Sequence, residues 1–122
     1  MKILLSIKRK YAELILKWEK IYEIRRLFTK KKIDKIVIYE SAPTKRVVGE
    51  CEIKEINYKP INELRNETKW GSCVDKEFFY EYFKGKEYWY AIKLKAPKRY
   101  KTPKTLSDYN LKRPPQNYCF IN

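Results

Sequence analysis

Apolar and polar residues alternate along much of the chain, which is the pattern of strands in a half-buried β-sheet. Such alternation, or a short apolar run, covers the six stretches 3–7, 20–28, 33–41, 47–56, 87–95 and 116–121. In the stretch 87–95 the even-numbered residues are apolar and are expected to face the core, so Trp89 is expected to face outward. The sequence therefore predicts about six strands.

A helical spacing of apolar residues replaces this alternation elsewhere. Between Tyr11 and Trp18 apolar residues recur at i, i+3, i+4 and i+7, which places Trp18 on the buried face of an amphipathic helix. Pro60 suits the first turn of a second helix that reaches about Thr68, and a third helix is predicted over 75–83. Strands dominate and no βαβ alternation occurs, so we predict an α+β, mainly β fold, a small barrel with about three short peripheral helices.

Two further positions carry structural information. Gly49 lies inside a predicted strand, where glycine indicates a bulge or a close approach of another backbone. The stretch 95–115 is rich in proline and is predicted to be a long loop, pinned by the side chains of Tyr100, Leu106 and Tyr109.

The length sets the expected organisation. The chain has 122 residues, of which 43% are hydrophobic and 16% aromatic, which suffices for one core. We therefore expect one domain over residues 1–122. The opening apolar run, residues 3–5, is too short for a signal peptide, and no stretch is long and apolar enough to span a bilayer. A cytoplasmic protein that does not engage membranes is the resulting expectation.

The residue types exclude several kinds of chemistry. Histidine is absent, which excludes Ser-His-Asp and Cys-His catalysis and the histidine-containing zinc sites of many hydrolases. Cys51, Cys73 and Cys119 lie far apart without a Cys-x-x-Cys pair, so we expect buried thiols rather than metal ligands. No metal and no cofactor is predicted, and any catalysis would rest on Lys, Tyr, Asp or Glu.

The charge is large and unevenly placed. The chain has 29 Lys or Arg and 15 Asp or Glu, a net charge of +14. Residues 1–32 carry +8 and residues 98–122 carry +5. Because the ends of small domains often lie close together, the two segments are expected to form one basic face, which is typical of proteins that bind nucleic acid or another anionic surface. A lysine-rich composition that serves solubility alone is the competing interpretation.

Four motifs, in order, resemble those of a known family. The segment KIYEIR at 20–25 resembles the Gly-x-Lys-x-x-Glu-x-Arg signature of the ASCH (activating-signal-cointegrator homology) domain, with Trp18 in place of the glycine. The ASCH domain is a branch of the PUA-like superfamily. The segment IVIYESAPTKRVVGECEI resembles the strand-turn-strand of many bacterial and archaeal members, including Ser41-x-Pro43 and the following Val-Gly pair. The ending LKRPPQNYCFI resembles their closing strand.

The resemblance covers essentially the whole chain, and it implies a PUA-like pseudo-barrel with a cleft between the barrel and the first helix, where the signature residues gather. ASCH domains are generally thought to bind RNA or to act as nucleic-acid-linked regulators. One bacterial branch hydrolyses N4-acylated cytidine nucleosides, and ribonuclease activity is attributed to another. The fold alone does not choose among these functions. The implied partner is RNA, another nucleic acid or a nucleoside-like ligand.

The candidate site residues have the chemistry to hold a nucleotide. Lys20 supplies a cation for a phosphate. Glu23 and Arg25 share a strand face, so the carboxylate can orient the guanidinium toward a phosphate or a base edge, and Tyr22 is a candidate for stacking on a base. Further candidates are a basic stripe and two cleft residues, namely Arg26, Lys45, Arg46 and Arg113, and Ser41 and Gln116. The structural alternatives are a solvated lysine and a surface ion pair worth about 0–1 kcal/mol.

Two other function classes compete with RNA binding. The first is a small hydrolase or ribonuclease with Lys20 and Glu23 as an acid–base pair. In the amidohydrolase branch the position of Glu23 is typically a threonine that serves as nucleophile. This chain has a carboxylate there, which excludes covalent catalysis through a hydroxyl at that position. Glu63 and Glu67, on the predicted second helix, are further carboxylates near the cleft edge. The second class is a protein-interaction module, which would present an exposed apolar patch.

Overall fold

The structure is a computed structural model, and it describes residues 1–68, 71, 81 and 84–122. In chain order its elements are β1 (Lys2–Ile7), α1 (Arg9–Leu16), β2 (Tyr22–Arg25), β3 (Lys35–Glu40), β4 (Arg46–Pro60), α2 (Ile61–Thr68), β5 (Tyr88–Lys104), the 3-10 helix η1 (Leu106–Tyr109) and β6 (Tyr118–Ile121). Within this described part, no helix is long and apolar enough to cross a membrane. Cys73 and, apart from residue 81, the third helix predicted over 75–83 lie outside the described residues.

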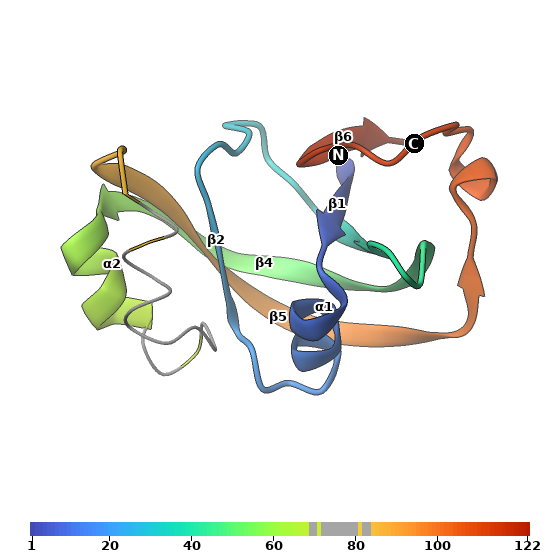
Figure 1. Cartoon of the computed structure of the whole chain (residues 1–122), viewed down its shortest axis with the longest axis horizontal. Coiled ribbons are helices and arrows are strands. Elements are labelled where there is room, and N and C mark those ends of the chain that lie inside the picture. Colours follow the sequence, from blue (N-terminus) through green and yellow to red (C-terminus); the bar gives the residue numbers. More distant parts are fainter. Residues whose placement is uncertain (69–70, 72–80, 82–83) are drawn as a thin grey trace.

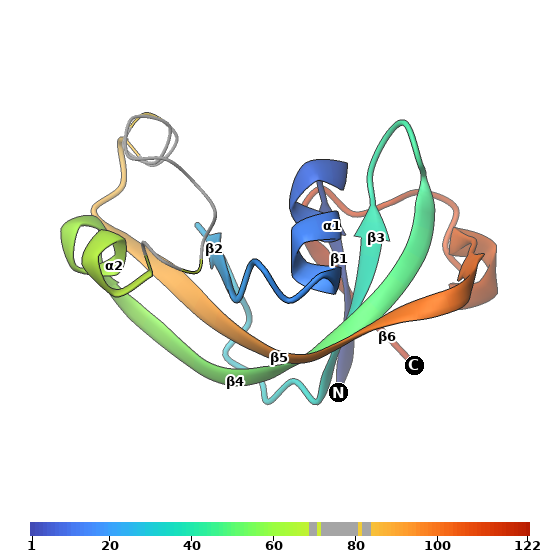
Figure 2. The same ribbon diagram turned by 90° about the horizontal axis from the view of Figure 1, so that it is seen from below.

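The six strands form one mixed sheet in the order β2-β5-β4-β3-β1-β6. Strands β1 and β3 are parallel, and the other neighbouring pairs are antiparallel. The long strands β4 and β5 bend together, with α1 on their concave side and α2 at one end (Figure 1, Figure 2). The sheet has two free edges and does not close into a barrel. Its α+β, mainly β architecture is that of a PUA-like pseudo-barrel, which confirms the predicted fold class.

The two ends of the chain lie side by side. Strands β1 and β6 pair antiparallel, with Lys2 opposite Ile121 and Leu5 opposite Tyr118 (Figure 1). The two basic terminal segments of the sequence therefore adjoin each other where β1 and β6 pair, as expected for the ends of a small domain.

The largest core cluster lies between α1 and the sheet. Alternate residues of β1 and β3, such as Leu5, Ile36 and Ile38, pack with Ile15 of α1, and all four side chains are almost fully buried. Burying one such side chain stabilises the fold by about 1.5–3 kcal/mol. The hydrophobic alternation of the sequence therefore specifies these strands and the side of the sheet that α1 covers.

Helix α2 packs on the other face of the sheet, and this contact corrects the prediction for Trp89. Trp89 is 3% exposed and clusters with Ala91, Leu64 of α2 and Ile24 of β2. Its indole nitrogen donates a hydrogen bond to the carbonyl oxygen of Lys86 at 2.8 Å. The outward assignment was wrong because α2 covers the face of β5 that carries Trp89 and Ala91. On the opposite face Tyr88, which alternation placed toward the core, is 42% exposed.

The predicted long loop over 95–115 is also corrected. Strand β5 continues to Lys104, which pairs with Val47 of β4. Pro97 and Pro103 are accommodated because they fall where the β4–β5 register shifts and no ladder donor is required of them. The residues predicted to pin this segment, Tyr100, Leu106 and Tyr109, do pack together, against a third core cluster that includes Leu4 and Tyr39.

Candidate ligand pocket

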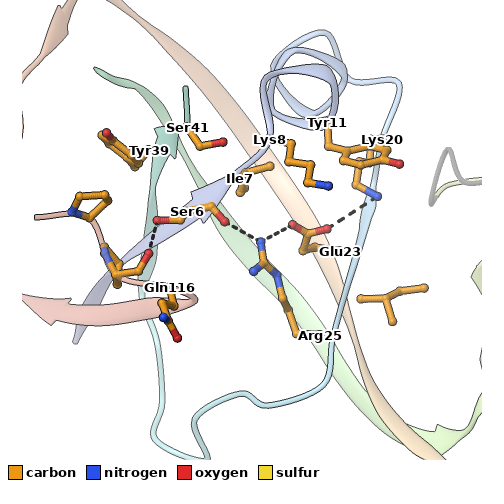
Figure 3. Close-up of a pocket in the computed structure, with 13 residues that line it drawn as sticks. Ser6, Ile7, Lys8, Tyr11, Lys20, Glu23, Arg25, Tyr39, Ser41 and Gln116 are labelled. Atoms are coloured by element: carbon orange, nitrogen blue, oxygen red, sulfur yellow. Dashed lines mark hydrogen bonds and ion pairs between the residues drawn. The ribbon is translucent and has the colours of Figure 1, made fainter. Parts of the chain in front are cut away.

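A pocket of about 370 Å³ opens between α1, the end of β1, strand β2 and the segment before β6 (Figure 3). Its wall combines charged, hydroxyl and apolar groups. The lining residues are Ser6, Ile7, Lys8, Tyr11, Lys20, Glu23, Ile24, Arg25, Tyr39, Ser41, Pro114, Pro115 and Gln116. Elements that are distant in sequence therefore build one concave site.

The turn after α1 brings Lys20 to this site, and it explains the exposure of Trp18. Trp18 lies beyond the end of α1, is 63% exposed and has a φ of 66°. Its amide donates to the carbonyl of Ile15, and the amides of Glu19 and Lys20 donate to the carbonyl of Leu14. A left-handed residue that ends a helix is usually glycine, as it is in the ASCH signature. The prediction of a buried Trp18 was wrong because the helix ends at Leu16, two residues before the last position of its apolar spacing.

The carboxylate of Glu23 lies between two cations. Arg25 Nη2 is 2.9 Å from Glu23 Oε2, and Lys20 Nζ is 3.7 Å from Glu23 Oε1 (Figure 3). Lys20 and Glu23 are 3% and 7% exposed. Burial alone raises the pKa of Glu23, but the charges of Arg25 and Lys20 and the hydrogen bond from Arg25 outweigh it, so the pKa lies below its usual range. The pocket wall therefore holds an ionised, largely desolvated carboxylate.

Arg25 lines the pocket and makes three hydrogen bonds inside the protein through its Nη atoms. Besides Glu23, its Nη2 donates to the carbonyl oxygen of Ser6 at 2.9 Å, and its Nη1 donates to Asn117 Oδ1 at 3.0 Å. Asn117 Nδ2 in turn donates to the carbonyl oxygen of Leu27 at 2.9 Å. The guanidinium thus ties β2 to the end of β1 and to the segment before β6, and it positions Glu23.

Lys20 has an aromatic neighbour as well as an anionic one. Its Nζ lies 5.1 Å from the centroid of the Tyr11 ring, on α1. A cation over an aromatic ring is stabilised by about 0.5–2 kcal/mol, more when both groups are desolvated. Tyr11, which the apolar spacing of the helix places toward the core, is half-buried: it packs against the main core cluster and also lines the pocket.

Half of the ten residues that the sequence predicted for the binding site lie together in the pocket wall. Lys20, Glu23, Arg25, Ser41 and Gln116 line the pocket. The others lie outside the lining: four are exposed basic residues, namely Arg26, Lys45, Arg46 and Arg113.

Tyr22 does not reach the pocket. It points to the opposite face of β2, is 8% exposed and packs with Trp89 and Leu64, because the strand alternation that turns Glu23 and Arg25 toward the pocket turns Tyr22 away from it. We therefore withdraw it as a base-stacking candidate.

Some pocket residues carry no signal in the sequence. Ser6 Oγ donates to the carbonyl oxygen of Pro115 at 2.7 Å, which fixes the wall contributed by the segment before β6. Asn117, beside the pocket lining, lies in the closing segment but carries no signal of its own, and only the fold reveals that it accepts a hydrogen bond from Arg25. Glu67, a carboxylate considered for the cleft edge, instead contacts Asn57 and Lys59 and does not line the pocket.

The described residues contain no cluster of three or more His, Cys, Asp or Glu side chains that could hold a metal ion. Cys51 is buried, as predicted, and Cys119 is half-buried. Burial, together with the nearby charge of Glu23, raises the pKa of Cys51 to about 12. This thiol is therefore protonated at neutral pH, when it is neither a good metal ligand nor a good nucleophile.

The lowered pKa of Glu23 predicts an acid dependence of stability. In the unfolded chain its pKa is about 4.3, so the stabilisation from its ionised form is fully present above that value and is lost as the pH falls through the lower pKa of the folded state. We expect the free energy of unfolding to fall more steeply with acid in the wild type than in Glu23→Gln. Urea unfolding at a series of pH values measures this, with exposed Glu55→Gln as the control. Parallel curves for wild type and Glu23→Gln would contradict the prediction.

Comparison with known proteins identifies the family and several relatives. The ASCH domain family matches residues 5–98. The large ribosomal subunit protein uL22 of Ureaplasma parvum serovar 3 is 28% identical over 90 residues, which is 74% of this chain and 29% of that protein. The ATP synthase subunit alpha of the same organism is 23% identical over 120 residues, or 98% of this chain and 15% of that protein. The chain thus spans less than a third of either relative.

Solved structures agree on the fold. The crystal structure of ASCH from Zymomonas mobilis has a TM-score of 0.91 at 23% identity, and the match covers 99% of this chain and 87% of that one. The N-terminal domain of Staphylothermus marinus McrB has a TM-score of 0.51 at 12% identity, covering 88% of this chain and 77% of that one. With the family match over most of its length and this architecture, the chain belongs to the ASCH domain family.

Proposed function

We propose that this chain is an RNA-binding ASCH domain whose pocket accepts one nucleotide of a single strand. The observation that supports it is the carboxylate of Glu23, which faces a cavity of about 370 Å³ and is held ionised by Lys20 and Arg25. Perturbed ionisable groups in a concave site are typical of binding or catalytic sites. The net charge of +14 favours a polyanionic partner.

The lining suits a nucleobase that carries an amino group. Ile7 and Pro115 supply apolar surface on which the face of a base can lie. Glu23 is an acceptor, and carboxylates accept hydrogen bonds from exocyclic amines such as the N4 group of cytosine. Ser41 and Gln116 add groups that both donate and accept. We therefore expect cytosine, adenine or guanine to be preferred over uracil, which offers Glu23 no amino group.

Phosphates of the flanking nucleotides require cations that are exposed. Lys8 is exposed and lines the pocket itself. Arg113 directly precedes the proline segment of the pocket wall, and Lys45 and Arg46 follow the turn that begins at Ser41. These four residues replace Arg25 in the role of phosphate ligands, because the Nη atoms of Arg25 already donate within the protein.

The decisive experiment is RNA binding as a function of salt. The probe is a fluorescein-labelled single-stranded oligo(A) of about 12 nucleotides, followed by fluorescence anisotropy. The variant replaces the four exposed cations near the pocket with alanine, namely Lys8, Lys45, Arg46 and Arg113. We expect weaker binding and a slope of log K against log salt that is less steep by about 0.7 for each phosphate that the variant no longer neutralises.

A matched control separates local contacts from net charge. It removes four exposed lysines outside the pocket lining, namely Lys54, Lys95, Lys98 and Lys101. A second variant, Ser41→Phe, fills the pocket without changing charge, and it is expected to weaken binding while leaving the salt slope unchanged. Equal losses of affinity for the two quadruple variants, or wild-type binding by Ser41→Phe, would contradict the proposed site.

A hydrolase is the second candidate, because Lys20 Nζ and Glu23 Oε1 lie 3.7 Å apart in the wall of the same pocket. We rank it below RNA binding for a physical reason. A general base works best when its pKa is near the working pH, and the two cations hold the pKa of Glu23 below its usual range. Incubation with N4-acetylcytidine and with the RNA probe tests this candidate. Turnover by the wild type that Lys20→Ala abolishes would favour an enzyme. If both substrates stay intact, the hydrolase is rejected and RNA binding remains the proposed function.

A further inference from the structure

A second aromatic surface lies outside the pocket, on the β4–β5 pair. Tyr58 of β4 is directly opposite Tyr90 of β5, and Tyr88 lies two residues before Tyr90, on the same face of the strand. The centroid of the Tyr58 ring is 4.4 Å from that of Tyr90 and 5.5 Å from that of Tyr88. The three side chains form a continuous tyrosine row.

Two of the three tyrosines in this row are open to solvent, whereas Tyr90 is partly buried and packs against the main core cluster. Tyr58 is 48% and Tyr88 42% exposed, and Ile56, two residues before Tyr58, is 39% exposed. Cross-strand aromatic pairs stabilise a sheet by only about 0.2–1 kcal/mol. Stability of the sheet therefore gives little reason to keep so much aromatic surface in water, and a contiguous exposed patch of this kind is typical of a contact surface.

A fixed cation lies over one ring of the tyrosine row. Lys86 Nζ is 5.8 Å from the centroid of the Tyr58 ring, and it donates a hydrogen bond to the carbonyl oxygen of Arg26 at 2.7 Å. Arg26 is itself exposed. The surface therefore combines stacked aromatic rings with positive charge, which is the combination used to bind single-stranded nucleic acid on a sheet face.

The tyrosine row adjoins the pocket through the sheet. Arg25, in the pocket wall, is the direct neighbour of Tyr90 in the β2–β5 register, and Tyr90 is the direct neighbour of Tyr58 in the β4–β5 register. Adjacent strands lie about 4.8 Å apart. A single strand with one nucleotide in the pocket would thus need only a few further nucleotides to reach the tyrosine row.

We propose that the tyrosine row is a second nucleic-acid contact, on which bases that flank the pocket-bound nucleotide of a single-stranded RNA stack. The proposal rests on the proposed function in taking RNA as the partner. RNA is favoured over a protein partner because the chain carries +14 and Lys86 lies at the row, so the surface complements a polyanion with exposed aromatic faces. Stacking on tyrosine is tolerant of sequence because every base has a π face.

The test compares Tyr58→Leu, which keeps apolar bulk but removes the π face, with Tyr58→Phe, which keeps it. The probe is the same oligo(A) strand, with an A·U duplex of the same length as a ligand that retains phosphates but hides its base faces. We expect Tyr58→Leu to bind the single strand about 5- to 100-fold more weakly, with an unchanged salt slope and unchanged duplex binding. Tyr58→Phe should bind like the wild type.

The outcomes separate this proposal from the pocket. If Tyr58→Leu binds like the wild type while Ser41→Phe is impaired, the tyrosine row is overturned and the pocket stands. If Tyr58→Leu alone is impaired, the tyrosine row is supported and the pocket fails. If the wild type does not bind the strand, both fail. Binding of a Pro-x-x-Pro peptide that Tyr58→Leu abolishes, with RNA binding unchanged, would overturn the proposal in favour of a protein partner. Circular dichroism verifies folding, and Tyr88→Leu replaces Tyr58→Leu if the latter does not fold.

Discussion

Arg25→Met is expected to lower the free energy of unfolding by about 3 kcal/mol, the lower part of the range for breaking a buried ion pair. The substitution leaves the carboxylate of Glu23 buried with one cation at 3.7 Å in place of two. It also leaves the carbonyl of Ser6 and the amide oxygen of Asn117 without their hydrogen bonds from the guanidinium. We place the loss at the lower end because the side chain of Arg25 is still 17% exposed.

Urea unfolding at neutral pH measures this loss, and Arg26→Met is the matched control. Arg26 is the next residue along the chain but is exposed, so its replacement should change the free energy of unfolding by no more than about 0.5 kcal/mol. Arg25→Lys keeps the charge but cannot form a planar fork toward Glu23, Ser6 and Asn117, and we expect it to recover only part of the loss. A loss below about 1 kcal/mol for Arg25→Met would show that the charges at the pocket are solvated rather than coupled.

The strands and their inward faces were predictable because each depends on local alternation. The alternation of apolar and polar residues that predicts strands around Leu5 and Ile38 also predicts that these two side chains face the core, because successive side chains of a strand point to opposite faces. Trp89 was misplaced because α2 covers a second face of β5, and the sequence gives no local sign of that contact. Trp18 was misplaced because it has the left-handed conformation that follows the end of its helix. A glycine at this position would have indicated the helix end, whereas a tryptophan does not.

The site was predictable where its residues share one strand. Alternation along β2 is enough to place Glu23 and Arg25 together, and the signature adds Lys20. It was not predictable where the partners come from far along the chain: Asn117 lies 92 residues from the guanidinium that it binds. The predicted role of Arg25 is revised for the same reason. Its guanidinium donates hydrogen bonds inside the protein to Ser6 and Asn117, which come from segments distant in the sequence.

These observations divide the positive charge into two functional groups. Lys20 and Arg25 are buried or nearly so, and they hold Glu23 ionised at the pocket wall. The exposed cations, such as Lys8 and Arg113, are the ones that solvent and a polyanion can reach. Counting charge along the sequence therefore indicates the class of partner but overstates the number of phosphate contacts, and only the exposed group is expected to affect the salt dependence of binding.

Gly49→Ala is expected to destabilise the fold by about 3 kcal/mol, the upper end for overpacking a core. A Cβ at Gly49 would lie 2.5 Å from the carbonyl oxygen of Lys98 in β5 and 2.7 Å from Leu16 Cδ2 in α1. The side chain of Leu16 can turn away, but the backbone of β5 cannot move without breaking its pairing with β4. The gain from a less flexible unfolded chain, about 0.4–1 kcal/mol, does not offset such a clash.

Gly85→Ala is the matched control because its cost has a different origin. Gly85 has a φ of 91°, and a Cβ there would meet no atom within 4 Å, so the expected loss is only the 1–2 kcal/mol or so of left-handed strain. Gly49→Ala should also weaken oligo(A) binding, although Gly49 does not line the pocket. Leu16 ends α1 one turn before Lys20, so a displaced helix end shifts the cation that helps to hold Glu23 ionised. A Gly49→Ala protein as stable as the wild type would mean that α1 and β5 separate freely there, and the pocket would then lack the rigid wall on which the proposed function depends.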